Sequence, residues 1–305
     1  MQGDRSPPPL LYWRQRGRER RGTRAKEIPV IELPEALTLA RQMSDALVGR
    51  IVVDAVANAS PHKFAFFTGD PATYGARLDG RRIEAAKATG PYVELPLDDG
   101  MTLLLREGVN ARLLAPGEAV PAKHQLLLAF DDGSHLACTA SMYGLFLIAD
   151  TGADDDEYYV AARDAVPVLS DAYDEAAFRS LAASAPPSAS VKALLATEQR
   201  IPGIGNGVLQ DILFNARLNP KTKMSALSDA DLARLFRAMK DTLAAMAEQG
   251  GRDVERDLYG QPGGYRCILS AKTWKDGCPV CHGEIEKKPY LGGNVYYCPA
   301  CQPLP

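Results

Sequence analysis

Residues 192–220 read KALLATEQRIPGIGNGVLQDILFNARLNP, with apolar residues at helical spacing on both sides of a central turn. The turn, Pro202 to Gly207, cannot continue a helix, because proline lacks a backbone donor and glycine favours bends with positive φ. The sequence therefore predicts helix, tight turn, helix, with the second helix opening at Asn206. Its first N–H groups lack helical partners, so an anion such as a nucleic-acid phosphate can bind there. An ordinary αα-hairpin without a ligand is the alternative.

The composition of the chain limits its function class. Its 305 residues and ordinary apolar share suit two domains with a core each. The formal net charge is −3, so a nucleic-acid site would have to be a local basic surface. No apolar run approaches a membrane span, and the polar, arginine-rich start lacks the apolar core of a secretory signal. We expect a monomer in the bacterial cytosol or nucleoid that does not contact a membrane.

Residues 1–27 differ in character from the rest of the chain. They hold a run of three prolines and seven arginines, with almost nothing to bury. We expect a disordered basic extension. It is either an arm that touches DNA or an upstream segment that the native protein lacks.

Residues 28–165 read as a strand-rich domain with a leading helix. Pro34 near a first turn, followed by apolar residues at helical spacing, predicts a helix that ends at Gly49. Hairpin turns are predicted at residues 98–100 and 131–133, since aspartate and glycine tolerate the required dihedral angles. The β-prone runs predict a sandwich or barrel, and they are 51–53, 64–67, 92–97, 101–105, 111–114, 125–130, 135–138 and 145–148.

Residues 166–260 read as a helical domain. A linker rich in alanine, serine and proline is predicted at 182–190. Beyond the stretch quoted above, Ser228 predicts the start of another helix, whose apolar face includes Met239 and Met246 and which ends at Gly250. We interpret these methionines as core residues rather than metal or cofactor ligands. The overall fold class is therefore α+β.

Residues 261–305 hold a metal motif, with the spacing of two thiolate knuckles. Its members are Cys278, Cys281, Cys298 and Cys301. Each CxxC supplies two soft ligands on one turn, and the two turns close a tetrahedron around one Zn²⁺, which leaves no position for water. The zinc should therefore be structural. A redox dithiol is the alternative, but no βαβ pattern surrounds the motif.

The order of these features resembles the formamidopyrimidine-DNA glycosylase and endonuclease VIII family. ELPE before a helix, a β domain, a helix-two-turn-helix unit with PGIGN and a four-cysteine zinc ribbon follow one another from Ile31 to Gln302. In that family an N-terminal proline attacks the sugar C1′ of a damaged nucleotide, a glutamate moves protons, and the lesion is flipped out of the duplex. The resemblance implies double-stranded damaged DNA as partner.

Several residues match family positions. Glu32 matches the catalytic glutamate, while Gly205 and Asn206 lie in the turn that binds phosphates beside the lesion. Lys192 lies where the family has a lysine, and the four cysteines match the zinc ligands. Arg106 and Arg200 are further candidates for phosphate contact.

The chain also departs from the family pattern. Ile31 occupies the position of the nucleophilic proline, and its nitrogen lies in a peptide bond. Two basic family positions fall on Pro91 and Gly293, so the phosphate clamp loses two cations. The side chains that wedge into the base stack fall on Val109 and on Met142-Tyr143.

Three routes to catalysis are compatible with these departures. Translation could begin at Val30, which would leave an amine near Ile31. Lys63 could serve as the nucleophile, although an ordinary loop lysine is the alternative. Glu32 could activate water and release the base without strand cleavage.

We therefore expect a DNA base-excision-repair glycosylase, with or without abasic-site lyase activity. A protein of the same fold that binds damaged DNA without catalysis is the first alternative. A zinc-ribbon protein that binds other proteins is the second.

Overall fold

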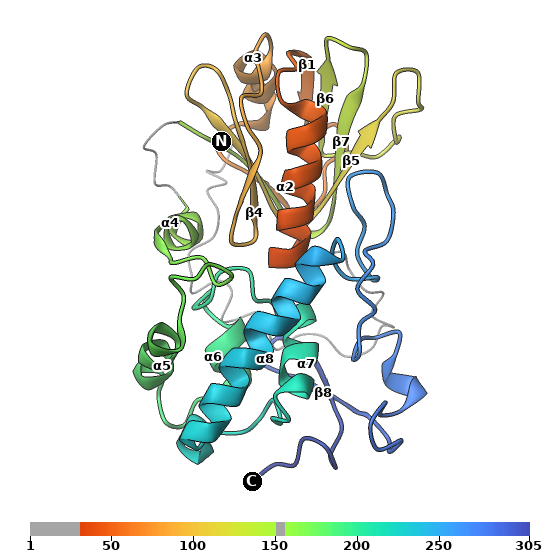
Figure 1. Ribbon diagram of the computed structural model, residues 1–305. Coiled ribbons are helices and arrows are strands. Elements are labelled where there is room, and N and C mark those ends of the chain that lie inside the picture. Colours follow the sequence, from red (N-terminus) through yellow and green to blue (C-terminus); the bar gives the residue numbers. More distant parts are fainter. Residues whose placement is uncertain (1–30, 151–155) are drawn as a thin grey trace.

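The computed structural model describes residues 31–150 and 156–305, and the extension predicted at 1–27 lies outside them. Two domains stack along the long axis, a strand-rich one above a helical one (Figure 1). This arrangement confirms the predicted α+β fold class. No helix in the described ranges is long and apolar enough to cross a bilayer.

The upper domain contains a seven-stranded sheet in the order β1-β6-β7-β5-β4-β3, with the short β2 parallel to β7. Its strands are β1 (Val52–Ala57), β2 (Ala65–Phe67), β3 (Lys87–Thr89), β4 (Tyr92–Pro96), β5 (Thr102–Leu114), β6 (Leu126–Phe130) and β7 (His135–Ala149). A short helical segment, η2 (Pro71–Thr73) with α3 (Tyr74–Leu78), connects β2 to β3. Both predicted hairpin turns are present, with Gly100 and Gly133 at φ 87° and 81°.

Two pairs of predicted runs are wrong as separate strands. Residues 101–105 and 111–114 belong to β5, and 135–138 and 145–148 belong to β7. The two long strands pair on both sides of a register shift, which lies at Gly108 and residues 141–143 between the runs. Tertiary pairing therefore overrides a local composition that is typical of a break.

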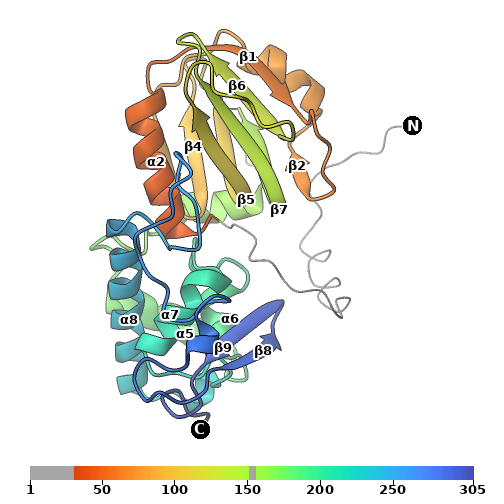
Figure 2. The ribbon, with the colours of Figure 1, turned by 90° about the vertical axis from the view of Figure 1, so that its right-hand side faces the viewer.

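The predicted leading helix is α2 (Leu33–Leu47), and it packs along the sheet (Figures 1 and 2). Its buried positions recur at helical spacing, which places one apolar stripe against the strands. The residues of this stripe are Ala36, Leu39, Ala40, Met43 and Leu47. On the other face, α4 (Glu157–Asp164) contributes Ala162 to a smaller cluster with Tyr92 and Leu145.

The lower domain contains α5 (Glu175–Ser184), α6 (Val191–Ala196), α7 (Asn206–Asn215), η3 (Met224–Ala226) and α8 (Asp229–Glu248). Helix α7 begins at Asn206 and α8 is capped by Ser228, as predicted. Met239 and Met246 are fully buried in the core. The predicted linker is wrong over residues 182–184, because α5 continues there and buries Phe178 and Ala182 in the same core.

Residues 249–265, here called the strap, leave the end of α8 and run back up beside α2 (Figure 1). Leu258 is fully buried in the core of the upper domain, and its carbonyl accepts a hydrogen bond from Leu113 N at 2.9 Å. The side chain of Gln42 on α2 binds both Leu258 N and the Asp257 carboxylate. The upper domain is therefore completed by chain that follows the helical domain in sequence.

The chain ends in η4 (Trp274–Asp276) and a two-stranded ribbon of β8 (Glu286–Tyr290) and β9 (Gly293–Tyr297). The first strand of this ribbon begins at Glu286, five residues after Cys281. Phe214 on α7 packs with Leu269, Ile285 and Tyr296, so the ribbon has a small core of its own.

Truncation of Leu258 should destabilise the protein, because it leaves a cavity in the core of the upper domain. We expect Leu258→Ala to lower the free energy of unfolding by about 2–5 kcal/mol in urea denaturation. The matched control is Tyr259→Ala, since Tyr259 is among the exposed hydrophobic side chains. A strap that merely rests on the surface would give equal, small effects for both variants.

Candidate functional site

Glu32 lies where the two domains meet. Its Oε1 accepts a hydrogen bond from Gly207 N at 2.8 Å, and its Oε2 accepts one from Val208 N at 2.7 Å. These donors belong to the first turn of α7, where helical N–H groups lack internal partners. The N–H groups that were predicted to bind a phosphate bind the carboxylate of Glu32 in the structure. Leu33 N adds a further link by donating to Gly203 O at 2.9 Å.

The glycines of the turn are required by this close approach. A Cβ on Gly205 would collide with the Glu32 carboxylate, and one on Gly207 would collide with the guanidinium of Arg252. Gly203 has φ of 90°, and a Cβ there would lie 2.7 Å from Leu33 Cβ. The glycines that predicted a turn therefore also let the upper domain contact the start of α7.

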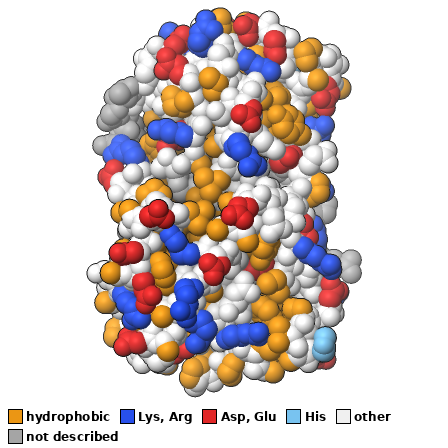
Figure 3. All heavy atoms as spheres, in the orientation of Figure 1, with side chains coloured by type: hydrophobic (Ala, Val, Ile, Leu, Met, Phe, Trp, Pro, Cys, Tyr) orange, Lys and Arg blue, Asp and Glu red, His pale blue; other side chains and the backbone are white. Residues whose placement is uncertain are grey.

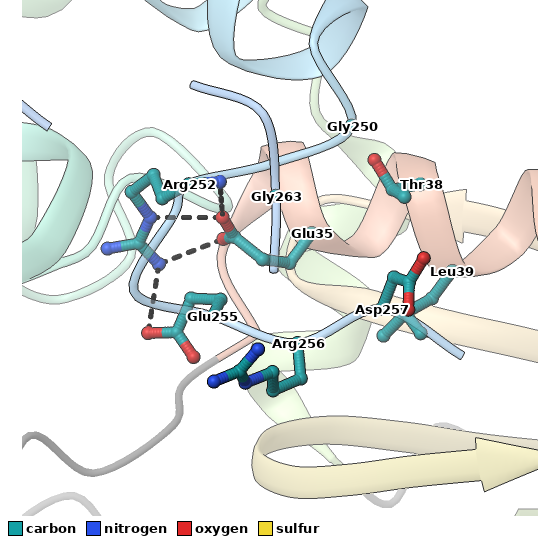
Figure 4. Close-up of a pocket in the computed structure, with 9 residues that line it drawn as sticks. All are labelled: Glu35, Thr38, Leu39, Gly250, Arg252, Glu255, Arg256, Asp257 and Gly263. Atoms are coloured by element: carbon teal, nitrogen blue, oxygen red, sulfur yellow. Dashed lines mark hydrogen bonds and ion pairs between the residues drawn. The ribbon is translucent and has the colours of Figure 1, made fainter. Parts of the chain in front are cut away.

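Arg252, in the strap, is buried among the carboxylates of Glu32, Glu35 and Glu255, and Figure 4 shows the last two of these around it. Its Nε and Nη2 donate to the two oxygens of Glu35 at 3.0 and 2.9 Å. Its Nη1 lies 3.6 Å from Glu32 Oε2, and its Nη2 lies 3.6 Å from Glu255 Oε1. Arg252 could not be predicted from the sequence, because no local pattern links it to the glutamates at the start of α2, more than two hundred residues away.

The electrostatics of this cluster raise the pKa of Glu32. Burial raises the pKa of Glu32 above its ordinary value, although the charge of Arg252 and the two backbone donors oppose the shift. Burial alone would lower the pKa of Arg252, but Glu32, Glu35 and Glu255 raise it well above its ordinary value. One cation thus faces three carboxylates.

Ile31 carries no nucleophile. Its side chain is buried, and its peptide N–H donates to Glu107 O at 3.0 Å. Lys63 lies apart from it, in the turn before β2, with Nζ 4.8 Å from the ring centroid of Phe64. Ala65 on β2 pairs with Gly144 on β7, and Gly144 pairs in turn with Glu107 on β5. Two strand spacings, about 10 Å, therefore separate the start of β2 from Glu107.

Lys192 and Asn206 connect α6 and α7 to the ribbon. Lys192 Nζ donates to Asn206 Oδ1 at 2.6 Å and to Tyr290 O at 2.8 Å. Burial lowers the pKa of Lys192 to about 8. Asn206 Nδ2 donates to Asn294 O at 3.0 Å, and a Cβ on Gly293 would lie 3.1 Å from Asn206 Cγ. The ribbon hairpin is thus docked closely on the start of α7.

The two predicted arginine contacts differ in environment. Arg106 is buried, with its guanidinium carbon 4.9 and 5.1 Å from the ring centroids of Tyr92 and Tyr158. Its Nη1 donates to Tyr92 Oη at 2.9 Å. Arg200 remains partly exposed and pairs with Glu198 at 2.9 Å. The structure brings neither arginine into contact with Glu32, and their roles in DNA binding stay predictions.

The pairing of β5 with β7 is irregular at residues 141–143, here called the finger. Glu107 pairs with Gly144 and Val109 pairs with Ala140, so three residues of β7 lie opposite Gly108 alone. The finger residue Tyr143 has φ of 57°, and its ring centroid lies 5.0 Å from that of Phe64. Val109, by contrast, is a buried core residue. The strands β2 and β7 and the ribbon lie on the side of the molecule opposite α2 and α8 (Figure 2).

The opposite side, which carries α2 and α8, shows both signs of charge (Figure 3). Lys and Arg side chains gather over its lower, helical half. Several arginines of the helical domain are paired with carboxylates, including Arg179 with Glu175 and Asp229. Figure 3 therefore shows mixed charge on this side rather than the uniformly basic surface that a phosphate backbone favours.

The four predicted cysteine ligands converge. Their Sγ atoms all lie within 4.8 Å of one another, and no other group of their kind was found in the described residues. Cys278 and Cys298 are buried in the small core of the ribbon. Four thiols at this separation could hold a metal ion, and an all-sulfur donor set suits a soft or borderline cation.

Comparisons with known proteins agree with this geometry. A model described as the formamidopyrimidine-DNA glycosylase N-terminal domain matches residues 30–151. The formamidopyrimidine-DNA glycosylase of Acidothermus cellulolyticus is 30% identical over 286 residues, which cover 90% of this chain and 98% of that protein. The formamidopyrimidine-DNA glycosylase of Roseobacter denitrificans is 26% identical over 293 residues. That match covers 89% of this chain and 99% of that protein.

Solved structures show the same architecture. The crystal structure of the MutM (Fpg) protein of Thermus thermophilus matches with a TM-score of 0.74 and 25% identity, over 90% of this chain and 99% of that one. Lactococcus lactis Fpg, in a complex with DNA containing N7-benzyl-Fapy-dG, matches with a TM-score of 0.76 and 21% identity. That match covers 89% of this chain and 99% of the other and supports the fold.

A methyl group at Gly207 should disrupt the contact between the domains, because it would displace the Arg252 guanidinium. We expect Gly207→Ala to lower the free energy of unfolding by about 3 kcal/mol in urea denaturation. The control is Gly250→Ala, where a Cβ meets nothing within 4 Å but φ is 78°. That variant reports the cost of left-handed backbone alone, about 1 kcal/mol. Equal losses in the two variants would contradict the packing argument.

Proposed function

Because the chain belongs to the formamidopyrimidine-DNA glycosylase family, we propose that it excises damaged bases from duplex DNA. The duplex binds on the side that carries the Tyr143 finger and the ribbon, and the lesion is flipped towards the junction of the two domains. Base loss follows hydrolysis of the N-glycosidic bond. The observation that carries this proposal is the carboxyl group of Glu32, held at the start of α7 directly beside position 31.

In this proposal Glu32 acts as a proton donor. Its burial raises its pKa, and Glu35 and Glu255 compete with it for Arg252. A proton delivered to the departing base, or to the sugar oxygen, makes the C1′–N bond easier to break. Water is the nucleophile, since the nitrogen of Ile31 lies in a peptide bond and donates to Glu107 O. Base release without strand cleavage then follows.

The proposed DNA contacts lie around the turn that precedes α7. Gly205 gives room to the Glu32 carboxylate at the turn, and Asn206 and Lys192 hold the ribbon hairpin beside it. Arg200 is partly exposed next to the turn and supplies a cation. Arg106 contributes from the upper domain by fixing the residues around it. We expect the protein to act as a monomer on chromosomal DNA in the bacterial cytosol.

We further propose that the four cysteines bind one structural Zn²⁺. Their spacing in sequence and the convergence of their Sγ atoms support a closed tetrahedral site. The bound ion would fix the ribbon, and the protein residues around position 31 would carry out the chemistry.

Base release from lesion-bearing duplexes tests the proposed activity, with oxidised purines, formamidopyrimidines and oxidised pyrimidines as substrates. We expect Glu32→Gln to lower the rate of base release by about 100-fold or more, because an amide cannot donate a proton as an acid does. The matched control is Glu255→Gln, which removes another carboxylate 3.6 Å from Arg252 but away from α7. A damaged-DNA-binding protein without catalysis would release no base and bind these duplexes equally well with either residue.

Removal of zinc should weaken DNA binding and leave the upper domain folded. We expect one zinc per chain by elemental analysis and loss of that zinc in Cys298→Ser. The affinity for lesion-bearing duplex should fall at least about tenfold, since the ribbon docks on Asn206 and Lys192. Val280→Ala, which changes an exposed side chain between two of the cysteines, is the control. Unchanged affinity of the zinc-free protein would exclude the ribbon from DNA binding.

A further inference from the structure

Glu107 has an unusual backbone conformation at the irregularity between β5 and β7. Its φ is 51°, in the left-handed region that residues other than glycine rarely adopt. The register of the two strands shifts directly after it. Strain of this kind persists where the surrounding structure enforces it, and it is concentrated at functional sites.

The position of Glu107 is next to the predicted reaction centre. Its carbonyl accepts the hydrogen bond from Ile31 N at 3.0 Å, so the two residues are neighbours across the sheet. The side chain of Glu107 is 40% exposed, whereas that of Glu32 is only 6% exposed. The carboxylate of Glu107 is therefore accessible from solvent, whereas that of Glu32 is enclosed at the domain junction.

The positive charge of Arg106 lies next to this carboxylate. Arg106 Nη2 lies 3.8 Å from Glu107 Oε2. The guanidinium cannot swing away, because it lies between the rings of Tyr92 and Tyr158 and donates to Tyr92 Oη. Tyr92 Oη in turn donates to Asp156 Oδ1 at 3.1 Å. Arg106 is thus a positioning residue that limits the range of orientations open to Glu107.

The two glutamates beside Ile31 therefore occupy opposite environments. Glu32 is buried, and both of its oxygens accept backbone hydrogen bonds. Glu107 is accessible, and its carboxylate lies 3.8 Å from the guanidinium of Arg106. Hydrolysis of a glycosidic bond needs one group that gives a proton and another that takes one, and a difference in environment is how proteins divide these roles.

Resting on the function proposed above, we infer that Glu107 is the general base that activates the attacking water. Its carboxylate takes a proton from water while the water oxygen forms the bond to C1′. The C1′–N bond breaks, and its electron pair leaves with the base, which receives the proton of Glu32. Exchange with solvent then restores a proton on Glu32 and removes the one on Glu107.

The first experiment compares base release by Glu107→Gln with that of wild type under single-turnover conditions. We expect a fall of about 100-fold or more, with the affinity for an abasic-site duplex within about twofold of wild type. The matched control is Glu118→Gln, because Glu118 is 38% exposed and also pairs with an arginine of the same domain. Base release at the wild-type rate by Glu107→Gln overturns the inference.

The second experiment separates catalysis from a structural role through Glu107→Gly. Glycine is favoured at a φ of 51°, so we expect the melting temperature to stay the same or rise. Base release should be lost and then restored in part by added formate, which supplies a carboxylate to the vacated space. A lower melting temperature and no rescue would assign Glu107 a structural role and overturn the inference.

The outcomes also distinguish the inference from the function on which it rests. If wild-type protein releases no base from any of the three classes of lesion, both fail. If wild type is active and Glu107→Gln is equally active, only the role of Glu107 fails.

Discussion

The buried contact of Glu32 and Glu35 with Arg252 is the interaction on which the rest of the structure depends. It joins α2, the start of α7 and the strap, and these three segments come from distant parts of the chain. Burying charges is costly, and such a cluster is stable only when each group is paired and hydrogen-bonded. Here the two backbone donors of α7 and the bidentate arginine meet that condition. The position of Ile31, and with it the geometry of the site, follows from this junction.

Several cations of the chain serve internal contacts. Arg252, Arg106 and Lys192 are all buried, and each holds two segments together. A protein with a net charge of −3 thus uses part of its positive charge for internal structure. The affinity of such a protein for a phosphate backbone should depend on relatively few contacts, and its salt dependence should be correspondingly shallow. Recognition would then rely more on the shape of the finger and the turn than on charge.

Features that depend on neighbouring residues could be predicted from the sequence, and features that depend on distant partners could not. The turn before α7, the capped start of α8, the hairpin glycines and the cysteine pairs are encoded by neighbouring residues, and the structure contains all of them. The full lengths of β5 and β7 were missed, because pairing between strands holds residues that look like a break. Arg252 and Leu258 were missed for a related reason, since their partners lie on α2 and β5. Glu107 carried no sequence signal, because its importance comes from a dihedral angle and a neighbour across the sheet.

The strap has a consequence for how this protein can be divided. A fragment that stops after the last strand of the upper domain would lack Leu258 and both partners of Gln42, so its core would be open at one edge. The complementary fragment would present that leucine to water. The two fragments should therefore associate when they are mixed. The assembled pair should tolerate a break in the chain between the domains. In this architecture the two domains fold as one unit, although they are separate in shape.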